Sequence, residues 1–237
     1  MAFRKTYSII GMALLLSTSC AAPAKTQQQQ LVELAEKNHA GALYHLGMMY
    51  LTGTSVQLDR KRAVEYFRKS YAQGDPLAAY KLGCFYDGQY QLLPVDFDRA
   101  LKLKLIAAQE GYALAQQDVA RLYARQNDIE QAKMWLKRAA DQGTADALVA
   151  YASIHNGFEG LEKDPSITAA YFRLYLKQFG GSSEQREWTE DFEATLTDVE
   201  RSRSKLIIRE YVAQPTALTL RAMRGQGDLE RVLRGAL

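Results

Sequence analysis

The sequence contains few cysteines and few histidines. Its 237 residues include two cysteines and three histidines. Besides Cys20, Cys84 is the only other thiol, so there is no framework of internal disulfides and stability must come from packing. His39, His45 and His155 do not form the pair, four residues apart on a helix, that a zinc-binding helix needs. The sequence therefore predicts no metal site and no cofactor.

Long apolar segments are also absent after the first twenty residues. Arg4 and Lys5 precede a compact apolar stretch, Ile9–Leu16, which is followed by the small residues of Ser17–Ala22. This order of basic, apolar and small residues is typical of a secretory signal. The apolar stretch is too short to be a stable membrane anchor. We therefore predict a signal peptide at residues 1–19.

Cys20 lies where the apolar stretch ends. Leu16–Cys20 resembles a bacterial lipobox, in which the cysteine is acylated and becomes the new N-terminus, although Ser17 stands where leucine is usual. The resemblance implies lipidation of Cys20, and Ala21 after it implies sorting to the outer membrane. Residues 20–30, rich in glutamine, would form a polar tether. The expected location is the periplasmic side of the outer membrane.

Ordinary cleavage after Ala22 or Ala24 is the alternative. It would leave a protein that is free in the periplasm or secreted, with no lipid to hold it.

No strong excess of positive charge is present. Removal of Arg4 and Lys5 with the signal peptide lowers the formal net charge from +3 to +1. A nucleic-acid-binding protein normally carries a pronounced basic surface, so we predict no nucleic-acid partner.

The sequence does contain two offset ladders of small residues. Gly47, Gly83, Ala120 and Ala152 recur after 36, 37 and 32 residues, each within a segment of helical apolar spacing. In the second ladder, Ala63, Ala100, Ala132 and Ala169 are each followed eleven residues later by a glycine: Gly74, Gly111, Gly143 and Gly180. Aspartates at 59, 96, 128 and 164 suit the N-caps of these second helices. The pattern predicts four helical hairpins.

These hairpins resemble the Sel1-like repeat, a relative of the tetratricopeptide repeat. The third copy carries the best match, Gln131–Gly143, and the fourth departs most, with Tyr151-Ala152 in place of Leu-Gly. The resemblance implies an all-α fold, a right-handed α-solenoid of hairpins with a helical C-terminal cap. We assign residues 31–181 to the array of about four repeats and residues 182–237 to the capping region.

Such arrays stack because one hairpin cannot bury its apolar face alone. By resemblance, the concave side, lined by the first helices, is the usual binding surface. On it we place eight partner-binding residues, several of them aromatic or methionine as at many interfaces: Tyr44, His45, Met48, Tyr80, Lys81, Phe85, Gln117 and Arg121.

The C-terminal segment loses the repeat. Trp188, Phe192, Leu196 and Val199 have the spacing of an amphipathic helix within Glu184–Glu200, a stretch with seven acidic residues. Further short helices are predicted at Thr216–Arg224 and Asp228–Leu233. We interpret this region as the cap that an open solenoid requires. The alternative is a contact with a partner or an anionic surface through the basic stretch Arg201–Lys205.

The sequence indicates no catalytic residues. Ser202 and Lys205 have the Ser-x-x-Lys spacing of penicillin-interacting enzymes, but the companion motifs are absent. The leading hypothesis is a non-catalytic interaction scaffold or adaptor of the bacterial cell envelope. Its expected partners are other envelope proteins, with cell-wall or exported polysaccharide as a further class. It would be attached to the membrane only through a lipid anchor. The alternatives are a free periplasmic or secreted adaptor or effector and, less favoured, a periplasmic hydrolase.

Overall fold

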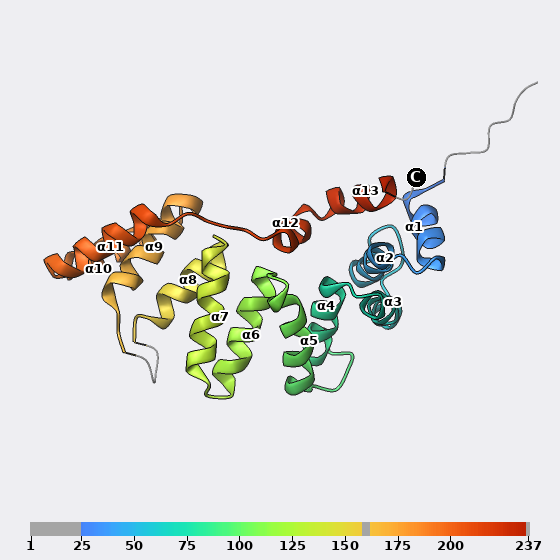
Figure 1. Ribbon diagram of the computed structural model, residues 1–237, viewed down its shortest axis with the longest axis horizontal. Coiled ribbons are helices and arrows are strands. Elements are labelled where there is room, and N and C mark those ends of the chain that lie inside the picture. Colours follow the sequence, from blue (N-terminus) through green and yellow to red (C-terminus); the bar gives the residue numbers. More distant parts are fainter. Residues whose placement is uncertain (1–24, 158–161, 236–237) are drawn as a thin grey trace, which may run out of the picture.

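The protein is built from helices. The computed structural model describes residues 25–157 and 162–235, and Cys20 and the predicted signal peptide lie outside these residues. The described residues form thirteen helices and no strand (Figure 1). Their bounds are α1 Gln27–Glu36, α2 Ala40–Thr52, α3 Arg60–Ala72, α4 Pro76–Tyr86, α5 Phe97–Gln109, α6 Ala113–Arg125, α7 Ile129–Asp141, α8 Ala145–Ile154, α9 Pro165–Phe179, α10 Ser183–Ala194, α11 Asp198–Glu210, α12 Ala217–Arg224 and α13 Gln226–Arg234.

Four hairpins stack in a curved row: α2–α3, α4–α5, α6–α7 and α8–α9. Each second helix begins at a predicted aspartate, whose carboxylate accepts a hydrogen bond from the backbone N–H three residues later, at 2.9–3.1 Å. These bonds satisfy backbone donors that a helix start leaves free. The predicted all-helical solenoid is confirmed.

The small residues of the first ladder let the two helices of a hairpin approach. A Cβ added at Gly47 would lie 2.7 Å from the ring of Phe67 on α3, and one at Gly83 would lie 2.6 Å from Cγ of Lys104 on α5. Both distances are too short for real side chains. Two glycines in helix interiors, each costing about 1 kcal/mol relative to alanine, are therefore explained by the bulky residues opposite them.

The structure differs from the sequence prediction at both ends of the array. Gln27–Gln30, predicted as tether, form the first turn of α1, because Thr26 and Gln29 make a reciprocal capping box. The helix predicted across Glu184–Glu200 is divided into α10 and α11. Thr197 makes a capping box with Glu200, which starts a new helix at Asp198.

The last two helices return to the beginning of the array. Residues 211–235, here called the return segment, leave α11 in an extended stretch and continue into α12 and α13 (Figure 1). The apolar side chains of α13, Leu229 and Val232, are buried against Leu31 of α1 and Leu46 of α2. The C-terminal helix thereby covers the N-terminal end of the solenoid.

The contacts of the return segment run through the hairpins in reverse order. Tyr211 Oη donates to the carbonyl of Ala140 at 2.7 Å, near the end of α7. Thr216 Oγ1 then donates to the carbonyl of Gly111 at 2.8 Å, in the turn between α5 and α6. Further along, Arg221 reaches the α3–α4 turn, and Asp228 reaches α2. The segment thus follows the edge of the array on which its glycine turns lie.

Candidate functional site

A groove lies between α6 and α8, with α7 as its floor. It encloses about 480 Å³. Most of its lining is apolar, and its charged residues, Asp118, Arg121 and Asp146, come from α6 and α8. The lining residues are Leu114, Gln117, Asp118, Ala120, Arg121 and Ala124 from α6, Ala132 and Leu136 from α7, and Asp146, Ala150, Ser153 and Ile154 from α8. Leu114 leaves 40% of its surface exposed. The groove can accept an apolar group and offers polar contacts at its rim.

A network of ion pairs adjoins the α6 wall of the groove. The ammonium of Lys104, a fully buried residue of α5, contacts the carboxylates of both Asp87 and Asp118. Arg121 Nη2 lies 3.3 Å from each of the same two carboxylates. Tyr80 Oη donates to Asp118 Oδ2 at 3.2 Å. Two cations and two carboxylates balance one another, so the network fixes Arg121 at the groove without leaving a buried net charge.

The protonation states of this network follow from its surroundings. Burial alone would lower the pKa of Lys104, but the carboxylates of Asp118 and Asp87 hold the pKa above its ordinary value. Burial lowers the pKa of Lys81 and raises that of the Cys84 thiol to about 11. Lys104 is therefore charged and Cys84 is a neutral thiol at neutral pH.

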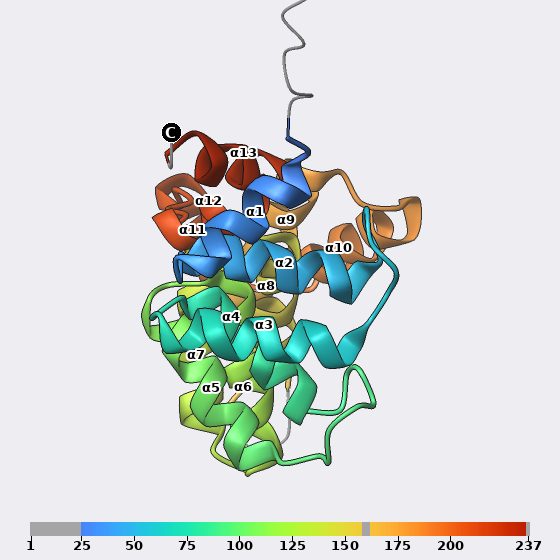
Figure 2. The same ribbon diagram turned by 90° about the vertical axis from the view of Figure 1, so that its right-hand side faces the viewer.

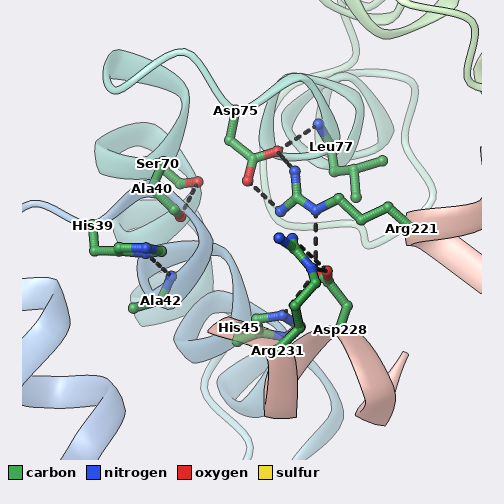
Figure 3. Close-up of polar contacts among 10 residues, drawn as sticks. All are labelled: His39, Ala40, Ala42, His45, Ser70, Asp75, Leu77, Arg221, Asp228 and Arg231. Atoms are coloured by element: carbon green, nitrogen blue, oxygen red, sulfur yellow. Dashed lines mark hydrogen bonds and ion pairs between the residues drawn. The ribbon is translucent and has the colours of Figure 1, made fainter. Parts of the chain in front are cut away.

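A second cavity, of about 610 Å³, lies where the return segment meets the start of the array. Tyr44, His45 and Met48 of α2 line it together with Arg221 and Asp228 of the return segment. Figure 3 shows the ion pairs beside it. His45 Nε2 lies 3.1 Å from Asp228 Oδ2, and Arg221 bridges Asp228 at 3.1 Å and Asp75 at 2.6 Å.

The charges beside this second cavity are also neutralised by one another. Burial opposes ionisation of Asp228, but hydrogen bonds from Arg231 and Arg221 hold its pKa below the ordinary value. Burial lowers the pKa of His45 although Asp228 lies beside it. Asp75 also caps α4 by accepting from the backbone N–H of Leu77 at 2.9 Å. We interpret these residues as the fastening of the return segment.

The eight residues predicted to bind a partner lie in four places. Gln117 and Arg121 line the groove, and Tyr80 and Lys81 lie beside the Asp118 network. Tyr44, His45 and Met48 line the second cavity. Phe85 is completely buried in the core and packs against Phe67 and Tyr90, so it offers no surface to a partner. They do not form one continuous surface.

The residues that hold these sites together, Lys104, Arg221 and Asp228, are not among those predicted from the sequence. Lys104 stands four residues after Ala100, where the first hairpin has Phe67. A lysine at an apolar position of the ladder, opposite Gly83, was a signal that could have identified it. Arg221 and Asp228 carried no such signal, because nothing in the repeat pattern relates the tail to α2 and α4.

The described residues hold no group of three or more histidine, cysteine, aspartate or glutamate side chains placed to bind a metal. Ser202 is exposed on α11, and its hydroxyl donates to the carbonyl of Asp198 at 2.7 Å. Among the helices between residues 25 and 235, leaving out 158–161, none combines the length and hydropathy required to cross a bilayer.

Two solved structures share this architecture. A protective antigen present in uropathogenic Escherichia coli strains, which displays an SLR fold, matches with a TM-score of 0.66 and 23% identity, over 82% of this chain and 42% of that chain. A Sel1 repeat protein from Oxalobacter formigenes matches with a TM-score of 0.61 and 21% identity, over 78% and 79% of the two chains. This chain thus spans less than half of the E. coli protein's length. At such identities the likeness establishes the fold alone.

The model of the Sel1 repeat matches four segments: residues 40–75, 76–112, 113–144 and 145–174. Each segment begins with the first helix of one hairpin, and together they cover more than half of the sequence. Sel1 repeats point to a scaffold for protein interactions. The hairpins, their small-residue ladders and the matched segments agree, and the chain belongs to the Sel1 repeat family.

Proposed function

We propose that this protein is a non-catalytic adaptor that binds a segment of a partner protein in the groove between α6 and α8. The observation that carries the proposal is the groove itself, an apolar cleft on the first helices of two adjacent Sel1 repeats. Ligand sites of this size combine an apolar lining with a few fixed polar groups.

The groove's lining suits a polypeptide. Ala120, Ala124 and Ala150 have short side chains, which let a partner's backbone come close. Leu114 would lose its exposed surface on binding, and burial of apolar surface is the main driving force of association. Arg121 and Asp146 at the rim add one charge of each sign, which can orient the bound segment.

The ion network prepares the α6 wall for binding. Arg121 is half-exposed, yet two carboxylates already hold its guanidinium in place. A side chain fixed before binding loses less conformational freedom on association than a mobile one. The network therefore supports recognition at the groove without taking part in any chemical step.

A variant that fills the groove tests this proposal. Ala150→Arg places a long charged side chain between α6 and α8, and Ala72→Arg makes the same change at an exposed position on α3, outside the groove. Both variants would be purified with cross-linking from the native host. We expect proteins retained by the wild type and by Ala72→Arg to be lost from Ala150→Arg. Equal retention by all three proteins would reject the groove as the binding site.

We further propose that a lipid on Cys20 holds the adaptor on the periplasmic side of the outer membrane. The support is the sequence of residues 1–22 alone. Wild type and Cys20→Ala would be compared by intact mass and by membrane fractionation. The proposal predicts a diacylglyceryl-sized mass increment and a membrane location that both depend on Cys20. A soluble wild type cleaved after Ala22 or Ala24 would favour a free periplasmic or secreted adaptor.

A further inference from the structure

Helix α10 carries aromatic side chains that α9 covers only in part. Trp188 is 42% exposed, stacks on Phe192 with ring centroids 5.2 Å apart, and meets the edge of Phe172 on α9 at 4.8 Å. Phe172 and Phe192 are partly buried, so Trp188 is the exposed member of the cluster. Tryptophan is enriched among the residues that dominate protein interfaces.

The exposure results from an open hairpin. In each of the four repeats, the second helix packs along the first. The chain turns after α10 as if to form a fifth hairpin, but α11 packs against α9 instead. Figure 2 shows α11 to the left of the array and α10 to the right. Among the described helices, α9 is the one that packs substantially against α10, so most of the α10 surface is free.

The polar residues around Trp188 are acidic. Five carboxylates and one arginine lie within Ser183–Ala194. Glu193 pairs with Arg173 of α9. Glu187, Glu190 and Asp191 are exposed and have no ion pair among the described residues. Asp191, three residues after Trp188, lies on the same side of α10 as the indole, Glu187 lies to one side, and Glu190 lies on the opposite side. An indole flanked by unpaired carboxylates favours cations, because the ring face attracts positive charge and the carboxylates can pair with it.

We propose that the exposed face of α10 is a second docking surface, which binds a Lys- or Arg-rich segment of a partner protein through Trp188 and its surrounding carboxylates. A basic side chain would lie over the indole while its neighbours pair with Glu187 and Asp191. Anionic lipid and nucleic acid are disfavoured by the same carboxylates. Two copies of this face would also repel each other if they met symmetrically.

This surface is independent of the groove between α6 and α8, so the two proposals fail separately. An adaptor with two surfaces can hold two partners, or two segments of one partner, at the same time. The Ala150→Arg variant should keep full binding at α10.

The test uses random twelve-residue peptides displayed on phage. Phage that bind the Trp188→Ala variant are first removed, and the remaining phage are selected on the purified wild-type protein without its signal peptide. We expect enrichment of peptides rich in lysine and arginine. A synthesised peptide from that pool should bind Trp188→Ala at least about fivefold more weakly than wild type. Trp188→Phe, which keeps an aromatic face, should lose less.

A charge variant guards against loss of fold in the tryptophan variant. Glu187→Gln and Asp191→Asn together leave the aromatic packing intact, and should weaken binding of the same peptide and flatten its salt dependence. Enrichment of neutral or acidic peptides, equal binding to the variants, or no enrichment would each overturn the proposal. Dimerisation through α10, detected by sedimentation and abolished by Trp188→Ala, would overturn it in favour of self-association.

Discussion

The repeat array and the return segment are held by different kinds of contact. In the array, alanines and aromatic rings of adjacent helices are buried together, and most of the buried polar side chains lie near helix ends. The return segment packs the ring of Tyr211 on Tyr171 and buries two apolar side chains of α13, and between these ends it relies mainly on hydrogen bonds and ion pairs. Apolar packing is strong and non-directional, whereas polar contacts are specific but individually modest. We therefore expect the array to determine global stability and the return segment to open first.

The largest effect should come from the apolar core of the array. Phe67 is fully buried, packs on Gly47 and meets the rings of Tyr44 and Phe85. Phe67→Ala should lower the free energy of unfolding by about 3–5 kcal/mol, measured by denaturant titration. Phe179→Ala, at a half-exposed position, is the control. Equal losses in the two variants would contradict the expected role of the core.

The next effect tests the ion-pair network around Lys104. Lys104→Met keeps the volume but leaves Asp87 and Asp118 with Arg121 alone, and should cost about 3 kcal/mol because buried carboxylates lose a partner. Adding Asp87→Asn and Asp118→Asn should recover much of the loss. Failure of this recovery would mean that Lys104 acts through packing and not through charge.

A smaller and more local effect is expected from Arg221→Met. It removes the cation between Asp75 and Asp228, which should cost about 2 kcal/mol. Hydrogen exchange should accelerate in α12 and α13 while α6 and α7 stay protected. Uniform acceleration across both regions would show that the return segment opens only with the array.

Acid should loosen the same fastening. The pKa of His45 in the docked state is below its ordinary 6.5. His45 therefore binds a proton more readily when the return segment is open, and the stability of the docked state falls as pH drops from 6.5 towards the lowered pKa. The lowered pKa of Asp228 acts in the same direction below its ordinary 3.8, since its stabilisation is lost as pH falls through the folded pKa. Exchange of α13 should therefore speed up between about pH 7.5 and 5.5, corrected for intrinsic rates. His45→Gln should remove that step, and an unchanged profile would contradict the assignment.

The smallest effect separates backbone strain from contact with the return segment. Gly74 and Gly111 both have positive φ, 84° and 88°, so alanine at either should cost about 1 kcal/mol. A Cβ at Gly111 would lie 2.6 Å from Thr216, whereas one at Gly74 would have nothing within 4 Å. Gly111→Ala should therefore lose slightly more in thermal unfolding and expose α12 to protease. Identical behaviour of the two variants would mean that the return segment tolerates the added methyl group.

The same division separates what the sequence could predict from what it could not. The ladder of Gly47 and Gly83 and the capping aspartates are local, repeated signals, and they predicted the hairpins and their turns. The pairing of Arg221 with Asp75 joins residues 146 positions apart with no periodicity behind it. Phe85 was predicted at a surface because it is aromatic and lies beside the ladder, yet the same spacing also suits the core. Side-chain direction at such positions depends on the neighbouring hairpins.

The path of the return segment has a consequence for how this protein can evolve. A solenoid usually tolerates gain or loss of a copy, because each unit touches only its neighbours. Here the tail meets α7, the α5–α6 turn, the α3–α4 turn and α2 in succession. Insertion or deletion of one hairpin would shift Asp228 away from His45 unless the tail changed its length by a matching amount. The length of the tail therefore constrains the number of hairpins in this array.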